Sequence, residues 1–238
     1  MKVVLLLFPL FLVSCATKYI LPANRFMTPE SQGGSFRGQF EFQATKAQES
    51  KIDASSGNVT SGVKYKKIYR TGYFLQASLL EQFDFYWSHI GSGLSLFGGK
   101  FQFLGASRSA KGTGHKMAFA GGFGGNSHDP DDQYMKTFTY KGQEFLLIYG
   151  YRFTENILPY ASLNYARYNM NAVMGRNAGV VDGDKVSEES KIKSLSGGLE
   201  FNHNAWVMKF EYTAQLIGTD RTQDKTCYIA GYSLGYSW

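Results

Sequence analysis

The chain has 238 residues, of which 43% are hydrophobic, 16% aromatic and 18% charged, with a formal net charge of +6. Abundant aromatics and modest charge exclude a disordered or collagen-like chain. A coiled coil is also excluded, because 27 glycines and many aromatics replace the Ala, Glu, Lys and Leu that it needs. The mean hydropathy of −0.26 excludes a membrane protein of many helices. The chain has no run of five or more like charges, so its sequence gives little support for binding to nucleic acid.

The first residues of the chain have the pattern of a secretory signal. Lys2 precedes an apolar run, residues 3–13, that is shorter than the roughly 20 residues of a transmembrane helix. The sequence Leu12-Val13-Ser14-Cys15 follows this run and resembles the lipobox of bacterial lipoproteins. The resemblance implies that residues 1–14 are cleaved, that Cys15 carries the lipid, and that Ala16 directs sorting to the outer membrane. The alternative is an ordinary signal peptide with an incidental cysteine.

The second cysteine is Cys227, near the other end of the chain. Lipidation of Cys15 would leave Cys227 without a disulfide partner, even in an oxidising compartment. A Cys15–Cys227 disulfide is the alternative.

Period-two alternation of apolar and polar residues recurs after residue 33. Phe40 and Phe42, for example, interleave with Glu41 and Gln43, which places the two kinds of residue on opposite faces of a strand. The alternation predicts about ten strands of roughly 10–14 residues, which is longer than usual in globular proteins and suits tilted membrane-spanning strands. The predicted strands are centred on residues 36–43, 69–78, 83–88, 97–103, 117–124, 144–153, 160–165, 194–201, 206–213 and 228–238.

The connections between these strands differ in length. Residues 79–82, 154–156 and 202–204 are tight, whereas residues 46–63, 125–137 and 175–190 are long and polar. Short periplasmic turns alternating with longer external loops are typical of outer-membrane barrels. The connections near 89–93 and 107–114 fit this alternation less well, so eight or twelve strands remain open. Residues 15–32 are expected to form a lipidated tether that enters the first strand from the periplasmic face.

Over residues 33–238 the chain resembles the small outer-membrane β-barrel proteins of Gram-negative bacteria. The resemblance rests on the strand pattern and on the last strand, where Tyr228, Tyr232, Tyr236 and the terminal Trp238 are similar to the signal that the barrel-assembly machinery recognises. It implies an all-β fold, a closed antiparallel up-and-down barrel, that contacts outer-membrane lipids and that machinery. A lipocalin-like soluble barrel, with the faces inverted, is the alternative. The sequence does not indicate an oligomeric state.

The polar faces of the strands are expected to line the lumen. They carry five positive and five negative side chains, and buried charges should be paired. We expect a network that plugs a narrow barrel, because eight strands are just filled by side chains whereas aqueous channels need 16–18. A small polar pore is the alternative. The expected network is Arg37, Glu41, Arg70, Asp84, Lys100, Glu144, Arg152, Glu200, Lys209 and Glu211.

Residues that could carry out catalysis or bind a metal are sparse. His128 with Asp129, Asp131 and Asp132 is the single acid–histidine cluster, in an expected external loop that is more typical of a solvated surface. No catalytic residues, metal or cofactor are expected. The sequence therefore predicts a lipid-anchored structural or surface-interaction barrel. A narrow pore or carrier of a small solute or hydrophobic ligand is the alternative, and an outer-membrane enzyme ranks third.

Overall fold

The computed structural model describes residues 18–21, 24–51, 66–90, 94–128, 135–174, 183, 185–219 and 222–238. The lipobox with Cys15 and the acidic loop with Asp129, Asp131 and Asp132 lie outside these ranges. The described residues contain strands and turns, and no helix among them could cross a membrane.

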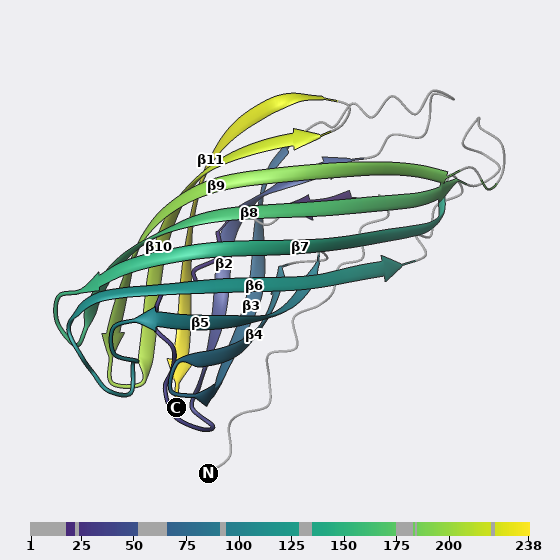
Figure 1. Cartoon of the computed structure of the whole chain (residues 1–238). Helices are drawn as coiled ribbons and strands as arrows, with labels where there is room; N and C mark the ends of the chain where they lie inside the picture. The colour runs from purple at the N-terminus through teal and green to yellow at the C-terminus, as the bar shows by residue number, and fades with distance from the viewer. Residues whose placement is uncertain are drawn as a thin grey trace, which may run out of the picture.

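Ten long antiparallel strands close into a barrel, as the alternation predicts (Figure 1). Consecutive strands from β2 to β11 pair along the chain, and β2 closes the sheet by pairing with both β3 and β11. A short additional strand, β1, pairs with the far end of β2. The strands are β1 (Lys18–Leu21), β2 (Gly38–Lys51), β3 (Lys66–Leu80), β4 (Phe83–Ile90), β5 (Ser95–Leu104), β6 (Gly114–His128), β7 (Met135–Arg152), β8 (Ile157–Met174), β9 (Lys185–His203), β10 (Trp206–Thr219) and β11 (Thr222–Ser237).

The two ends of the barrel differ in the length of their connections. One end, called here the turn end, carries the connections at 81–82, 105–113, 153–156 and 204–205, together with the C-terminus (Figure 1). The opposite end, called the loop end, carries the connections at 52–65, 91–94, 129–134, 175–184 and 220–221. The expected alternation of connections is therefore present in large part. The longer connection between β5 and β6 belongs to the turn end, and the short ones between β4 and β5 and between β10 and β11 belong to the loop end.

The outer face of the barrel is apolar and aromatic. Because successive side chains of a strand point to opposite faces, each strand presents one apolar row outward. Neighbouring rows contact each other, as where the rings of Tyr212 and Tyr228 stack at 6.3 Å and those of Trp206 and Tyr236 meet edge to face at 5.8 Å. The aromatic residues of the expected assembly signal are all on this face, about half exposed: Tyr228, Tyr232, Tyr236 and Trp238. A soluble barrel would have the opposite polarity.

Residues 24–32, which lie between β1 and β2 in the sequence, are inside the barrel. Every residue from 24 to 32 is buried, and these residues, called here the plug segment, contact lumenal side chains of several strands. The sequence predicts an extended tether on the periplasmic side for this stretch, without a place in the lumen. The difference arises because the segment has no strand periodicity and is held by contacts to residues far along the chain.

The lumen is divided into an apolar and a charged half. Towards the loop end, buried apolar side chains from β5, from β7 to β11 and from Leu94 cluster with Leu21 of β1. Towards the turn end, buried charged and amide side chains predominate, with a few apolar ones such as Leu158 and Val207 among them. The sequence predicts polar side chains throughout the lumen, so the apolar half is a departure from that expectation. It is lined by Leu94, Leu96, Phe138, Tyr140, Ala166, Tyr168, Met170, Ala172, Ile192, Ile217, Cys227 and Ile229.

Candidate functional site

Glu211 binds the N-terminal part of the plug segment. Its carboxylate accepts hydrogen bonds from the backbone amides of Arg25 and Phe26, at 2.9 Å each. The Tyr160 hydroxyl donates to the same carboxylate at 3.1 Å. The amide of Asn24 donates to Thr213 on the same strand at 3.0 Å. Because the plug segment has no regular secondary structure, its buried amides need partners from the barrel wall, and Glu211 supplies two acceptors.

Two lysines of the barrel wall donate hydrogen bonds to carbonyl groups of the plug segment. Lys209 donates to the Phe26 carbonyl at 2.8 Å, and Lys100 donates to the carbonyls of Thr28 (3.2 Å) and Glu30. Both ammonium groups also face a wall carboxylate: Lys209 lies 2.5 Å from Glu41, and Lys100 lies 3.4 Å from Asp84. The lumenal charges therefore do more than pair with each other, since they also satisfy an irregular buried backbone.

Glu30 of the plug segment takes part in a buried ion-pair network near the turn end. Its two oxygens bind Arg152, through Nε at 2.6 Å and Nη2 at 2.5 Å. Lys116 lies 3.4 Å from the same carboxylate. Arg152 also binds Glu200 at 2.8 Å, and Arg108 binds Glu200 at 2.7 Å. The two-sided contact between Glu30 and the Arg152 guanidinium is a strong and directional form of carboxylate recognition.

The last residues of the plug segment are held in the same way. Asp84 accepts a hydrogen bond from the Gln32 amide at 3.2 Å, and Gln102 accepts one from the Ser31 amide at 2.7 Å. The carbonyl of Ser31 accepts from the Arg108 amide at 2.9 Å. Backbone groups from Arg25 near one end of the plug segment to Gln32 at the other thus have partners in the barrel wall or in the connection between β5 and β6.

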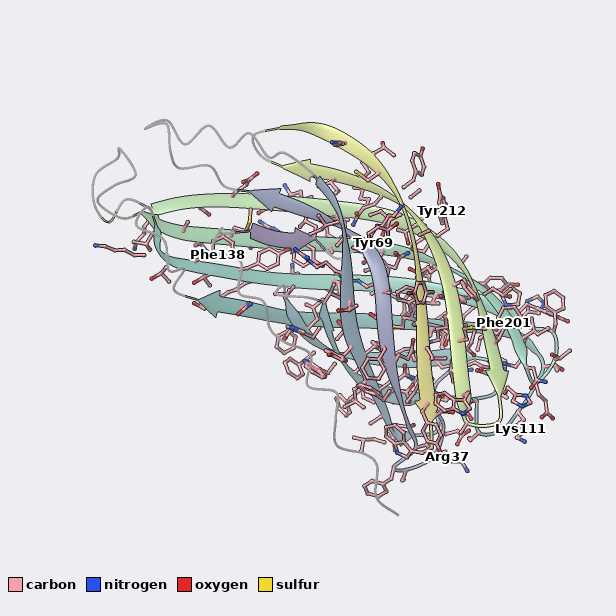
Figure 2. All side chains as sticks on the ribbon, turned by 180° about the vertical axis from the view of Figure 1, so that it is seen from behind. Arg37, Tyr69, Lys111, Phe138, Phe201 and Tyr212 are labelled. Atoms are coloured by element: carbon pink, nitrogen blue, oxygen red, sulfur yellow. The ribbon has the colours of Figure 1, made fainter. Side chains whose placement is uncertain are left out.

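The structure places eight of the ten expected network residues in the lumen, where they are almost fully buried: Glu41, Asp84, Lys100, Glu144, Arg152, Glu200, Lys209 and Glu211. Arg37 is exposed at the turn end (Figure 2), because it precedes the first residue of β2 and therefore has no lumenal face. Arg70 is only half-buried and lies well along β3 towards the loop end, away from the charged half. The expectation for Arg37 and Arg70 thus differs from their observed positions.

Four further charged residues belong to the network and were not anticipated. Lys116 continues the inward row of Ala118 and Ala120 by one step, so the alternation of β6 could have indicated it. Arg108 lies in the connection between β5 and β6, and Arg25 and Glu30 lie in the plug segment, where no periodicity exists. With these four, the lumen holds six acidic and six basic side chains that contact one another or the plug segment.

Three inward tyrosines are positioned by glycines on neighbouring strands. Tyr86 is opposite Gly98, Tyr168 is opposite Gly142, and Tyr160 is opposite Gly198. A Cβ on Gly198 would lie 2.4 Å from the Tyr160 ring, so each ring occupies the space that a side chain would fill. The hydroxyls then reach the network, where Tyr86 donates to Glu144 at 3.2 Å and Arg25 donates to Tyr168 at 2.7 Å.

The lumen has little free space in the described residues. The recess beside Arg25, Glu144 and Phe74 has no room for a water molecule. A cavity of about 280 Å³ opens at the turn end, between the plug segment at Gln32, the connection at Arg108 and the end of β11 at Trp238. This cavity lies at the mouth of the barrel, where Arg108 of the ion-pair network forms part of its lining.

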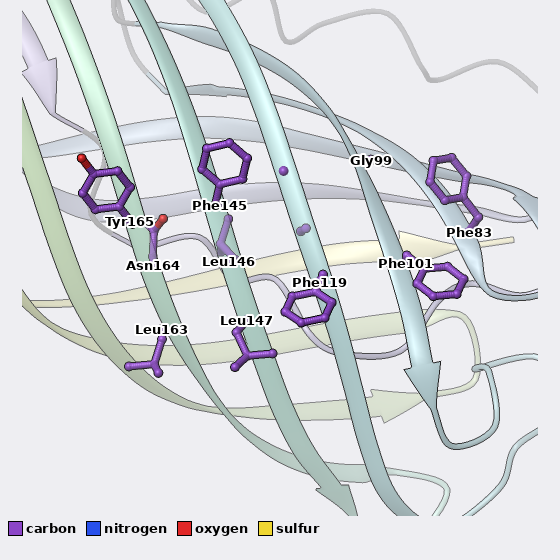
Figure 3. A pocket seen from close by; sticks show the side chains of 12 residues that line it. Phe83, Gly99, Phe101, Phe119, Phe145, Leu146, Leu147, Leu163, Asn164 and Tyr165 are labelled. Carbon is purple, nitrogen blue, oxygen red and sulfur yellow. The ribbon is translucent and has the colours of Figure 1, made fainter.

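The outer surface is hollowed over β5 to β8 (Figure 3). Gly99 and Gly121 carry no side chain there, and the surrounding rows leave a groove of about 710 Å³. Its walls are almost wholly apolar and include Phe83, Phe101, Phe119, Phe145, Leu147, Leu163 and Tyr165. An apolar groove on the outward face matches a hydrocarbon chain in polarity.

The described residues offer few groups that could catalyse a reaction or hold a metal. No cluster of three His, Cys, Asp or Glu side chains in the described ranges could hold a metal ion. His89 bonds to Ser95 at 2.8 Å and His115 to Tyr149 at 2.7 Å, and both histidines lie on the outward rows of their strands. Cys227 is a buried residue of the apolar half of the lumen.

A closed antiparallel barrel with an apolar outer face and buried charges inside is the fold of outer-membrane β-barrel proteins. No protein-family model matches the sequence, and neither does any curated protein. Solved structures similar to this chain include Ail, the attachment invasion locus protein of Yersinia pestis, at 12% identity and a TM-score of 0.42, covering 86% of this chain and 100% of that chain.

Two further solved structures are similar at the same low level. The N-terminal β-barrel domain of OprF from Pseudomonas aeruginosa is 12% identical with a TM-score of 0.38, covering 86% of this chain and 99% of that one. Neisserial surface protein A is 11% identical with a TM-score of 0.38, covering 86% and 96%. Likeness at this level carries no information about function.

Proposed function

We propose that this chain is an integral outer-membrane β-barrel of structural or surface-interaction type, anchored additionally by a lipid on Cys15 and closed to solutes by its own plug segment. The observation that supports this most strongly is the filled lumen. Residues 24–32 are buried in it and bonded to the barrel wall at both ends, through Glu211 and through Asp84. A barrel without an open path does not conduct solutes, so it acts through its outer surface and its loops.

The apolar outer face supports residence in a membrane. Exposed Phe, Leu, Tyr and Trp side chains cover every long strand, and water would make such a surface costly. In hydrocarbon the same surface is solvated, and closure of the barrel leaves no unpaired strand edge around the bilayer-spanning belt. Outer-membrane lipids are therefore the proposed partners of this face, with an acyl chain in the groove over β5 to β8. The barrel-assembly machinery is the proposed partner of β11 during insertion.

The leakage of ions from proteoliposomes tests the closed lumen. The full chain is folded into liposomes loaded with K⁺, and the folded fraction is quantified by its heat-dependent migration on gels. We expect K⁺ to leave no faster than from protein-free liposomes. Fast, protein-dependent efflux would overturn the proposal and favour the narrow pore, which is the alternative function.

Metabolic labelling with a fatty-acid analogue tests the lipid on Cys15. We expect the full chain to be labelled and Cys15→Ser to be unlabelled, with Cys227→Ser as the matched control that stays labelled. Labelling that persists in Cys15→Ser would overturn the anchor.

A further inference from the structure

The contacts of residues 18–32 with β2 show in which direction this part of the chain runs through the barrel. Lys18 is paired with Lys51, and Leu21 with Gln48, so β1 lies beside the loop end of β2. Further along, Thr45 donates to Asn24 at 2.5 Å. Finally, Gln32 donates to Gln39 at 2.8 Å, next to the first residue of β2. From residue 18 to residue 32, the partners on β2 therefore shift steadily from Lys51 to Gln39, so this part of the chain runs antiparallel to β2.

The position of β2 itself is fixed at both ends. Gly38 exchanges backbone hydrogen bonds with Trp238, at 3.3 and 3.0 Å, so it lies at the turn end beside the C-terminus. Lys51 precedes the 52–65 connection of the loop end. The chain therefore enters the lumen at the loop end and leaves it at the turn end, where β2 begins.

The distance between these ends decides where the residues before β1 can lie. At about 3.3 Å per residue, Gly38 to Lys51 spans about 43 Å, and a strand tilt of about 40° reduces this to about 33 Å along the barrel axis. That length is close to the hydrocarbon thickness of a bilayer, about 30 Å. Cys15 is three residues before Lys18, and three residues reach at most about 11 Å. Cys15 therefore cannot return to the turn end.

We infer that the barrel carries the N-terminal part of its chain through its own lumen, so that a lipid on Cys15 inserts into the external leaflet of the outer membrane. Short turns and the C-terminus mark the periplasmic side of such barrels, and long loops mark the external side. The inference rests on the proposed lipidation of Cys15, and it reverses the expected tether, which runs from the periplasmic face.

The order of assembly follows from the same contacts. The lumen beside Arg25 and Glu144 has no room for a water molecule, so a lipid-bearing end cannot pass through the finished barrel. The strands must therefore close around the plug segment after the lipid has been attached. The contacts of Glu211 and Arg152 with that segment form across 185 and 122 residues of sequence, respectively, as the late strands join.

An antibody epitope inserted between Thr17 and Lys18 tests the inference in intact cells, because antibodies do not cross the outer membrane. A matched variant carries the same epitope between Ala110 and Lys111, in the connection at the turn end. Only protein with the heat-dependent migration of a folded barrel is scored. We expect the first epitope to bind antibody on intact cells, and the second to bind only after the outer membrane is opened.

The inference would be overturned if the first epitope bound antibody only after the outer membrane is opened. Fatty-acid labelling of the same variants separates the two claims. A labelled protein with an internal first epitope contradicts the threading and leaves the lipid anchor standing. An unlabelled protein with an external first epitope contradicts the anchor and supports the threading alone.

Discussion

At the scale of single residues, Glu30 makes the clearest link between the plug segment and the wall. Glu30→Gln removes a carboxylate that binds Arg152 and faces Lys116. Unpairing a buried charge completely costs about 3–5 kcal/mol, and Arg152 keeps Glu200, so we expect a loss of about 2 kcal/mol in the free energy of unfolding. Urea unfolding of the barrel in lipid vesicles measures this loss.

The matched control for that variant is Glu155→Gln at the turn end. Glu155 lies 3.7 Å from Lys111, and both side chains are more than 60% exposed. An exposed pair contributes about 0–1 kcal/mol, so the control is expected to unfold at nearly the wild-type urea concentration. Equal shifts for both variants would mean that Glu30 is not buried among charges.

Two adjacent glycines of β9 test the packing of the inward tyrosines. Gly198→Ala places a methyl group 2.4 Å from the Tyr160 ring, whereas a methyl group on Gly197 meets nothing within 4 Å. Overpacking in a filled interior costs about 1–3 kcal/mol, so we expect Gly198→Ala to lower the unfolding free energy by this amount. Gly197→Ala should be close to neutral. Urea unfolding checks both, and a neutral Gly198→Ala would contradict the packing of Tyr160.

At the scale of elements, the strands were predictable and the plug segment was not. The alternation of Phe40 and Phe42 with Glu41 and Gln43 is a local property of a two-faced strand, and the structure confirms the strand and both faces. Inward charges such as Lys209 and Glu200 could be located for the same reason. Residues 24–32 have no such period, because their backbone is held by side chains more than 50 residues away.

Replacement of residues 24–32 by a flexible Gly/Ser stretch of equal length tests the plug segment as an element. The rest of the barrel keeps buried charges of both signs, such as Glu200, Glu211, Lys209 and Arg152, so we expect a barrel that still folds. It should be less stable than the wild type, and it should release K⁺ from liposomes. A second variant keeps Arg25 and Glu30 within the Gly/Ser stretch and should release K⁺ more slowly. Liposomes as tight as those of the wild type would contradict a plug made by this segment.

At the scale of the whole molecule, the barrel is turned inside out relative to a soluble protein. Its aromatic rows face outward, and its charges balance one another around an irregular backbone segment whose polar groups only a closed wall can satisfy. Composition and alternation predict this polarity, since both are properties of single strands. The occupant of the lumen depends on the closed barrel, and the sequence therefore does not reveal it.

Cleavage of the folded, full-length barrel by trypsin tests the central claim most directly, that residues 24–32 occupy the lumen. The peptide bond after Arg25 is buried there, whereas the bond after Lys111 lies in an exposed turn. Mass spectrometry of the products should show early cleavage after Lys111 and none after Arg25 until the barrel is unfolded by heat. Cleavage after Arg25 in the folded barrel, as fast as cleavage after Lys111, would contradict the account.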